Sequence, residues 1–218
     1  MYKYVIITGW IFVCLFACHS KQEKQTVQTV EAIEKITDPS YIFDGVSLDG
    51  WEVVNFGLQG AVSVKQGELL LERGDGCTGI TWEKDPPVMD YRISLDAKRV
   101  AGNDFFCGLT FPVGDEFCSL IVGGWGGAIV GLSCIDGRDA SDNETTNRMR
   151  IEDNRWYHIT LEVSGGIIKA MIDDQLMVDF MIGERRLSVR PEVNLNIPLG
   201  IATWHTTGAF KNIRLEEI

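Results

Sequence analysis

The stretch that decides the fold is WYHITLEVSGGIIKAMIDDQLMVDF, residues 156–180. Within residues 156–163, the side chains Tyr, Ile, Leu and Val recur at every second position, which is the period of a β-strand. Two glycines, and later two aspartates, separate this segment from β-forming segments at residues 167–172 and 176–180. This spacing predicts three antiparallel strands joined by tight turns, which is a meander.

The same pattern extends to both sides of the meander. Further short β-forming segments lie at residues 62–64, 68–71, 91–97, 105–110, 200–204 and 210–215. No segment between residues 41 and 218 shows a sustained 3.6-residue hydrophobic period with helix caps. We therefore predict an all-β fold of about a dozen short strands, an antiparallel β-sandwich of the jelly-roll type. In such a fold we expect a ligand on the concave face of one sheet, where several strands converge.

Glycines and one tryptophan distinguish residues 102–146 from a simple series of strands. Trp125 lies between two glycine pairs. The run ends in a loop that carries four acids in nine residues, Asp136, Asp139, Asp142 and Glu144. Glycine lets a ligand approach the backbone closely, and an aromatic ring flanked by glycines has a face free for stacking. The combination favours a surface that handles sugars.

The N-terminal residues have the pattern of an export signal. Lys3 precedes an apolar segment that is too short to span a bilayer, and this segment ends in Leu-Phe-Ala before Cys18. We expect residues 1–17 to be a bacterial lipoprotein signal peptide and Cys18 to carry the lipid anchor; an ordinary secretory signal is the alternative. Residues 18–40 are polar and predict a tether, and residues 41–218 predict the folded domain. Together these features predict an exported lipoprotein of the bacterial cell envelope, anchored in the membrane.

Composition excludes some partners and leaves the cysteine chemistry open. The formal net charge of −11 argues against a nucleic-acid partner, because phosphates repel an acidic surface. The predicted domain has four cysteines, Cys77, Cys107, Cys118 and Cys134, without zinc-site spacing. Cys107 and Cys118 flank a predicted hairpin turn at residues 112–116 and would not lie opposite each other. Disulfides and buried free thiols are both compatible with the sequence.

Residues 43–51, FDGVSLDGW, resemble the opening signature of the 3-keto-disaccharide hydrolase domain family. The resemblance continues in sequence order through GNDFFCGLTFPVGD, LIVGGWGG, GLSCIDGRDASDNETT, RWYHI, IDD and LGIATW, and it covers residues 41–218. It implies a concanavalin A-like lectin/glucanase sandwich, often found on secreted lipoproteins. It also implies action on glycosides that are already oxidised to a ketone at carbon 3. The resemblance assigns no catalytic residue.

Cleavage of a 3-keto-glycoside by elimination requires particular side chains. The ketone acidifies the proton on C2, so a base removes that proton, a donor or cation stabilises the enolate, and the C1 leaving group departs. Direct hydrolysis would instead use two carboxylates flanking the bond. We expect Asp104, and Asp136 and Glu144 of the acidic loop, to be catalytic residues. Each of these acids would also fit a turn in which it accepts hydrogen bonds from the backbone.

The acidic loop also offers ligands for a metal ion. Asp136, Asp139 and Asn143 carry the oxygen atoms that hard cations prefer, so they are candidate ligands of a Ca²⁺ ion that would stabilise the enolate. The spacing does not match a known calcium-binding loop. The alternative is a solvated loop whose Asp and Asn side chains cap turns.

The remaining candidates come from other strand ends. His205 is a candidate general base, because a histidine titrates near neutral pH. Trp125 and Trp204 are expected to stack on sugar rings, and Asn103 and Lys98 to make polar contacts with the substrate.

Two functions of different class therefore stand side by side. The first is an enzyme that cleaves 3-keto-glycosides by elimination or hydrolysis. The second is a carbohydrate-binding lipoprotein without catalysis, which would use the same sandwich and aromatic side chains. Convergence of Asp104, Asp136 and Glu144 near Trp125 would favour the enzyme, whereas acids scattered over the rim would favour binding or a structural role, since the site and not the fold determines function.

Overall fold

The computed structural model describes residues 34–218. The predicted signal peptide, Cys18 and residues 18–33 of the predicted tether lie outside the described residues. Helical structure within residues 34–218 is confined to α1 (Gly124–Gly127) and a 3-10 helix, η1 (Pro191–Asn196). No helix in this part of the chain is long and apolar enough to cross a membrane.

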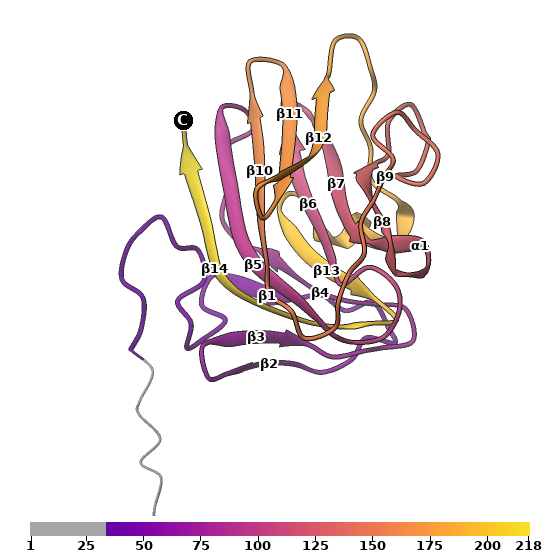
Figure 1. The fold of residues 1–218 in the computed structure, drawn as a ribbon. Coiled ribbons are helices and arrows are strands. Elements are labelled where there is room, and N and C mark those ends of the chain that lie inside the picture. The colour runs from indigo at the N-terminus through magenta and orange to yellow at the C-terminus, as the bar shows by residue number, and fades with distance from the viewer. Residues whose placement is uncertain (1–33) are drawn as a thin grey trace, which may run out of the picture. The chain divides into compact units, whose positions relative to one another are not determined.

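Two antiparallel seven-stranded sheets form the described part of the chain (Figure 1). We call them the β6 sheet and the β10 sheet. The β6 sheet has the spatial order β1 (Trp51–Val53), β4 (Cys77–Trp82), β13 (Gly200–Trp204), β6 (Cys107–Val113), β7 (Glu116–Gly123), β8 (Ile129–Ser133) and β9 (Asn147–Arg148). The β10 sheet has the order β12 (Gln175–Met181), β11 (Ile167–Ile172), β10 (Tyr157–Ser164), β5 (Tyr91–Ala101), β14 (Thr207–Glu217), β3 (Glu68–Leu71) and β2 (Val62–Lys65). The predicted all-β sandwich is confirmed.

The meander forms as its sequence pattern predicts. Strands β10, β11 and β12 pair in succession, with Ile159 opposite Ile172 and Ile168 opposite Phe180. Along β10 the burial alternates, and Tyr157, Ile159, Leu161 and Val163 are all fully buried. The hydrophobic period of two in the sequence therefore becomes one face of the β10 sheet, which packs against the β6 sheet.

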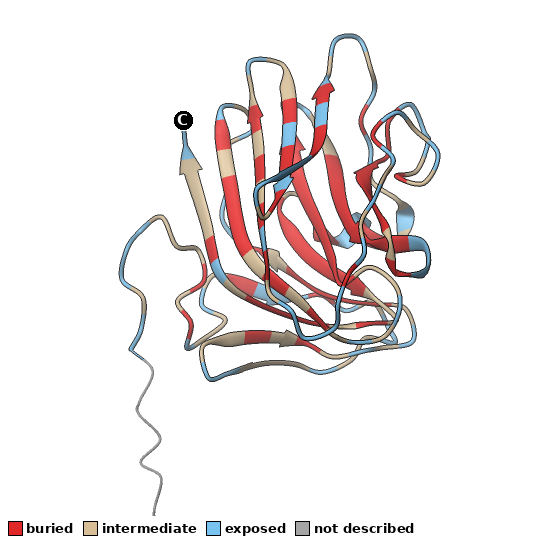
Figure 2. Ribbon diagram, in the orientation of Figure 1, coloured by how far each residue is buried: buried red, intermediate tan, exposed pale blue. Residues whose placement is uncertain are grey.

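The hydrophobic core lies between the two sheets and runs the length of the strands (Figure 2). In the β6 sheet, the core receives every second side chain, such as Leu109, Leu120 and Leu132. The intervening side chains point to the other face of this sheet, and several of them are small: Gly108, Thr110, Ser119, Gly131 and Ala202. Small side chains leave room above the sheet, and this outer face of the β6 sheet is where a pocket forms.

The family signature FDGVSLDGW builds a corner of the fold. Trp51 packs against Trp82 with ring centroids 5.0 Å apart and donates from Nε1 to the carbonyl of Ile42 at 2.6 Å. Asp44 accepts hydrogen bonds from the backbone N–H and hydroxyl of Ser47 at 2.7 and 2.6 Å. Burial opposes ionisation of Asp44, but these bonds outweigh it and lower its pKa. The signature therefore maintains the architecture of the sandwich.

Residues just before this corner also contact the domain. The backbone N–H of Ile36 donates to the carbonyl of Asp44 at 3.0 Å, and Leu215 donates to the carbonyl of Ser40 at 2.8 Å. Lys35 pairs with Asp44 at 3.0 Å. The last residues of the predicted tether thus lie against β14 and the signature corner.

All four cysteines of the domain are buried free thiols. Cys107 lies opposite Val122 and Cys118 opposite Phe111 on the β6–β7 hairpin, so the two thiols are out of register as predicted. Burial raises the pKa of Cys77, Cys107 and Cys118 to about 12. These cysteines act as small hydrophobic residues. Of the two alternatives that the sequence left open, disulfides and buried free thiols, the structure shows free thiols.

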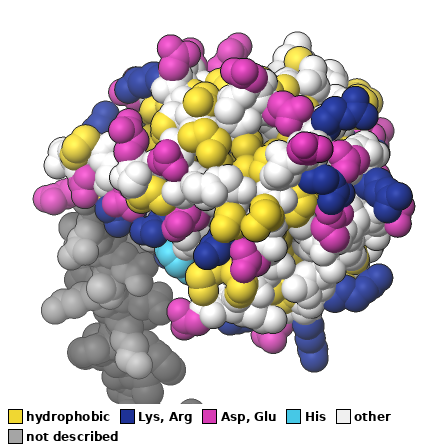
Figure 3. Space-filling view, turned by 90° about the horizontal axis from the view of Figure 1, so that it is seen from above, with side chains coloured by type: hydrophobic (Ala, Val, Ile, Leu, Met, Phe, Trp, Pro, Cys, Tyr) yellow, Lys and Arg dark blue, Asp and Glu magenta, His cyan; other side chains and the backbone are white. Residues whose placement is uncertain are grey.

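Acidic side chains are prominent on the surface. Seen from above, they surround a group of hydrophobic side chains, with lysines and arginines among them (Figure 3). This distribution agrees with the net charge of −11. An acidic surface of this kind disfavours contact with a phosphate backbone.

Gly50 tests the importance of the signature corner. Its φ is +80°, and a Cβ at this position would lie 2.7 Å from the Trp82 ring. We expect Gly50→Ala to destabilise the domain more than Gly57→Ala, by roughly 1–3 kcal/mol, because only the first forces a side chain into a packed ring. Gly57 is the matched control, since its φ is +91° but a Cβ there would meet no atom within 4 Å. Urea-induced unfolding measures the difference, and equal losses for the two variants would contradict the proposed packing role.

Candidate functional site

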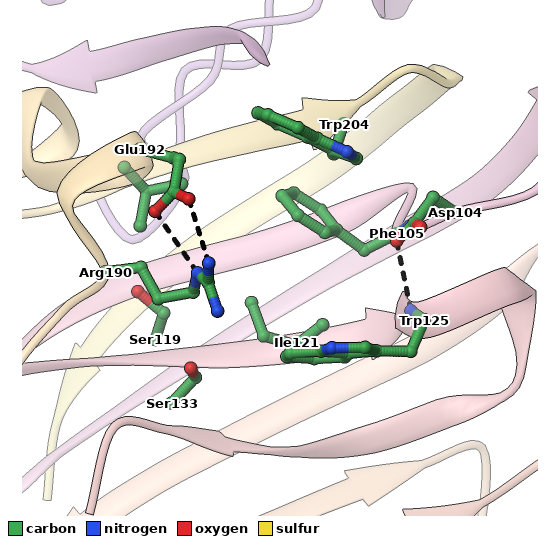
Figure 4. Close-up of a pocket in the computed structure, with 10 residues that line it drawn as sticks. Asp104, Phe105, Ser119, Ile121, Trp125, Ser133, Arg190, Glu192 and Trp204 are labelled. Carbon is green, nitrogen blue, oxygen red and sulfur yellow. Dashed lines mark hydrogen bonds and ion pairs between the residues drawn. The ribbon is translucent and has the colours of Figure 1, made fainter. Parts of the chain in front are cut away.

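A cavity of about 230 Å³ opens on the outer face of the β6 sheet. Its floor and walls come from β7, β8, β13, the segment before β6, the α1 turn and the segment leading into η1 (Figure 4). The lining residues are Asp104, Phe105, Ser119, Ile121, Trp125, Ser133, Arg190, Glu192, Val193 and Trp204. Side chains from distant parts of the sequence therefore meet in one pocket.

The pocket has two aromatic walls and a polar end. Trp204 and Trp125 lie on opposite sides, with the Phe105 ring between them in the view of Figure 4. Arg190 and Glu192 occupy the end opposite Asp104. The apolar faces of aromatic rings suit the C–H faces of a sugar, and charged groups suit its hydroxyl and carbonyl oxygens.

Trp125 is presented by an unusual turn. The short α1 turn has a helix-like hydrogen bond from the N–H of Ala128 to the carbonyl of Gly124, but its backbone angles are not those of a right-handed helix. Trp125 has φ 48° and ψ 59°, and its neighbour Gly126 has φ 84°. A left-handed conformation is uncommon for a bulky residue and costs energy. The carboxylate of Asp104 accepts a hydrogen bond from the Trp125 backbone N–H at 3.1 Å and so holds the turn. Trp125, which is 41% exposed, is thereby placed at the pocket mouth.

Asp104 accepts hydrogen bonds from the backbone, as the turn alternative predicts, and it also lines the pocket. Its Oδ1 accepts hydrogen bonds from the backbone N–H of Phe105 at 2.8 Å and of Trp125 at 3.1 Å. Within residues 34–218, Oδ2 has no hydrogen-bond partner. A carboxylate fixed through one oxygen and free at the other is suited to take a proton from a bound ligand.

Arg190 and Glu192 complete the polar end of the pocket, and sequence reasoning did not select them. The guanidinium donates from Nε and Nη2 to the two carboxylate oxygens of Glu192 at 3.2 and 2.8 Å. The hydrogen bond from Arg190 lowers the pKa of Glu192, so this carboxylate is ionised at neutral pH. The only local signal was Pro191, which starts η1 and indicates a helical turn between these two side chains.

The acidic loop is held by arginines and does not enter the pocket. Arg185 forms ion pairs with both Asp136 and Glu144, and Arg186 donates its backbone N–H to Asp136 at 2.9 Å. Neither Asp136 nor Glu144 lines the cavity, so the expected convergence of these acids with Asp104 is not observed. The two arginines lie about fifty residues further along the chain.

The residues expected to bind Ca²⁺ do not fit a metal site. Asn143 uses its Oδ1 to accept from the N–H and hydroxyl of Thr145 at 2.9 and 2.7 Å, and its amide donates to the carbonyls of Leu132 and Asp139. Asp136 pairs with Arg185. In the described part of the chain, no three His, Cys, Asp or Glu side chains gather as metal ligands. The alternative, a loop whose side chains cap turns, describes this segment.

Three further predicted residues lie outside the pocket. His205 contacts Trp204 edge-on and has its Nδ1 3.9 Å from Asp75, but it does not line the cavity. Asn103 precedes Asp104 and is exposed. Lys98 lies on β5 in the other sheet, where it pairs with Glu68 at 2.9 Å. Of the predicted site residues, the structure brings together Asp104, Trp125 and Trp204.

The protein is a β-sandwich of a carbohydrate-active domain family. The chain belongs to the family described as the 3-keto-alpha-glucoside-1,2-lyase-like domain, which matches residues 38–216. This match covers nearly the whole described structure and confirms the family resemblance of the sequence.

Solved structures share the fold at low sequence identity. A candidate glycosyl hydrolase from Parabacteroides distasonis is 14% identical with a TM-score of 0.52, over 80% of this chain and 91% of that chain. A mutant of the Emp46p carbohydrate recognition domain is 12% identical with a TM-score of 0.52, over 83% of this chain and 91% of that chain. At these identities the likeness concerns the fold alone. No curated protein matches the chain.

The arginine-held loop should loosen in acid. The backbone N–H of Arg186, with Arg185, lowers the pKa of Asp136, and the backbone N–H of Glu144 itself, with Arg185, lowers the pKa of Glu144. A depressed folded-state pKa contributes stability above the unfolded value of about 4, and this contribution is lost as pH falls through the folded value. We expect hydrogen-exchange protection of the loop amides to decrease between about pH 5 and pH 3.

Arg185→Gln provides the comparison for this pH dependence. At pH 7 the variant should already show loop protection reduced by up to about thirtyfold, the upper range for the loss of two exposed ion pairs, and its pH profile should be flatter. Amides of β11 serve as the internal control, since that strand lies in the other sheet. Identical pH profiles for the wild type and the variant would show that the ion pairs do not hold the loop.

Proposed function

We propose that this domain cleaves 3-keto-glycosides in the pocket of the β6 sheet, beginning with abstraction of the C2 proton. One observation supports this proposal above the others. A carboxylate with a free oxygen, Asp104, and a guanidinium, Arg190, line the same cavity between two tryptophan rings. Membership of a family named for 3-keto-α-glucoside lyase activity points to the same chemistry.

The size of the pocket indicates how much of a substrate it accepts. A volume of about 230 Å³ lies below the range of about 300–1,000 Å³ typical of pockets that enclose drug-sized ligands. The pocket therefore suits one sugar ring, with the group attached at C1 extending towards solvent. Trp125 and Trp204 would contact that ring from opposite sides of the pocket, with Phe105 as a third aromatic contact.

In the proposed reaction, Asp104 acts as the base. Its Oδ2 takes the proton from C2, and the C–H electron pair moves to the C3 carbonyl to form an enolate. When the C3 carbonyl re-forms, a double bond develops between C1 and C2, and the bond from C1 to the aglycone oxygen breaks. Protonated Asp104 returns its proton to the departing oxygen. Addition of water across the new double bond then gives the hydrolysis product.

Arg190 is proposed to stabilise the enolate. Its guanidinium makes three hydrogen bonds to Glu192 and Asp139, and a guanidinium has further N–H groups for an additional acceptor. A fixed cation directed at an oxygen that gains charge stabilises the transition state more than the ground state. Glu192 remains ionised and orients the guanidinium, so it is proposed to support Arg190 without transferring a proton.

Carbohydrate binding without catalysis is the second candidate. The observation that favours it is the position of Asp136 and Glu144, which pair with Arg185 away from the cavity. In this case the tryptophans and Arg190 would hold a sugar, and Asp104 would only fix the Trp125 turn. The two candidates differ in whether bound sugar is cleaved.

Incubation with a 3-keto-glucoside and with its unoxidised parent separates the two functions. We expect aglycone release from the keto form alone, with a rate that Asp104→Asn lowers by about 10²–10⁴-fold, since a general base is lost. A chelator should leave the rate unchanged, because the loop acids are paired with arginines. Asp115→Asn, in the exposed turn between β6 and β7, is the matched control and should retain the rate.

Each outcome of this assay has a defined meaning. Binding of the keto sugar without release would support the binding function and contradict the enzymatic one. Equal release from the keto form and its parent would contradict the C2 mechanism. Absence of both binding and release would reject the proposed function as a whole.

A further inference from the structure

Asp139 is the one acid of the acidic loop that contacts a pocket residue. Its Oδ2 accepts a hydrogen bond from Nη1 of Arg190. Its Oδ1 lies 3.3 Å from the Cys134 thiol and 3.4 Å from the Ser133 hydroxyl. Asp139 itself does not line the cavity. It therefore contacts the site from outside the cavity, chiefly through Arg190 and more weakly through Ser133.

The position of Asp139 is fixed by the loop around it. The Asn143 amide donates to the carbonyls of Leu132 and Asp139 at 2.8 Å each, which ties the loop to the end of β8. The backbone N–H of Asp136 donates to the carbonyl of Arg186 at 2.8 Å, which ties the loop to the segment that leads to Arg190. These bonds anchor the Asp139 carboxylate to the β6 sheet.

Two carboxylates hold Arg190, but only one of them fixes it relative to the sheet. Glu192 is two residues away on the same segment, so an Arg190–Glu192 pair alone would move as that segment moves. Asp139 comes from a different segment and binds a different guanidinium nitrogen. Together they fix both the position and the plane of the guanidinium, which has a fork geometry that a second acceptor can orient.

We infer that Asp139 is a positioning residue that acts through Arg190, so the acidic loop serves the reaction as an anchor for the arginine of the pocket. This inference rests on the proposed function. It gives a role to a loop that otherwise lies outside the cavity. A misplacement of a catalytic group by about 1 Å can cost about 10²-fold in rate, so loss of this anchor should reduce turnover.

Asp136 supplies a matched control within the same loop. It also pairs with an arginine, Arg185, but neither of these residues lines the cavity. Asp136→Asn therefore removes a comparable loop ion pair and leaves the Arg190 anchor intact. Any effect of general loop loosening would appear in both variants, whereas an effect through Arg190 would appear only in Asp139→Asn.

A double-mutant cycle on the full-length protein tests the inference. It comprises the wild type, Asp139→Asn, Arg190→Lys and the double variant, assayed with a 3-keto-glucoside. Lysine keeps the charge of Arg190 but loses the fork that contacts two carboxylates. We expect Asp139→Asn to lower kcat by about 10–100-fold with a smaller change in KM, and to have no further effect in the Arg190→Lys background. Asp136→Asn should stay within about twofold of the wild type.

Asp139→Glu is included in case Asp139→Asn impairs folding, which thermal unfolding monitored by circular dichroism detects. Glutamate keeps the charge and shifts the carboxylate by one methylene, so an intermediate loss of kcat is expected. The inference would be overturned if Asp139→Asn lowered kcat by the same factor in the wild-type and Arg190→Lys backgrounds. It would also be overturned if Asp136→Asn lowered kcat as much as Asp139→Asn does.

The failure of the proposed function gives a different result from the failure of this inference. If the wild type releases no aglycone, the proposed cleavage fails, and the same cycle is then measured by calorimetric binding of the 3-keto-glucoside. Non-additive effects of Asp139 and Arg190 on Kd would support positioning of Arg190 for binding. Additive effects on Kd, or no binding by the wild type, would overturn it.

Discussion

The burial of alternate side chains between two sheets is the constraint on which the rest of the structure depends. Leucines, isoleucines and aromatic residues at every second position fill the core, so the intervening positions of the β6 sheet face outward. Because those positions carry small side chains such as Gly108 and Ser119, the outer face of this sheet has room for a pocket. The segments that cover the face, around Trp125 and Arg190, then supply its walls.

Charge pairing gives the acidic loop its role. The loop meets the segment before η1 through Arg185 and Arg190. Its carboxylates therefore form ion pairs with arginines, whereas the sequence suggested that they bind a metal ion. A paired carboxylate stays ionised and keeps its partner in place. The pocket is thus assembled in layers: strands set the floor, glycine turns present Trp125, and the loop orients Arg190.

Features that depend on residues close together in the sequence could be predicted, whereas features that depend on residues far apart in the sequence could not. Local periodicity revealed the strands, and the glycine-flanked Trp125 and the Gly-Asn-Asp104 turn carried local signals that led to the pocket. Alternation with the buried Ala97 predicts that Lys98 points away from the core, but its exclusion from the site follows from the place of β5 in the other sheet, which depends on long-range strand pairing. Arg190 and Glu192 lie in a segment without periodicity. The pairing of Arg190 with Asp139 joins residues about fifty positions apart, which a single sequence does not reveal.

The most direct test of the proposed site is a crystal structure of the Asp104→Asn variant with a bound 3-keto-glucoside. We predict one sugar ring between Trp125 and Trp204 on the outer face of the β6 sheet, with its C3 oxygen towards Arg190 and C2 towards residue 104. A sugar bound elsewhere, for example on the β10 sheet beside Trp156, or one whose C3 oxygen points away from Arg190, would contradict this prediction.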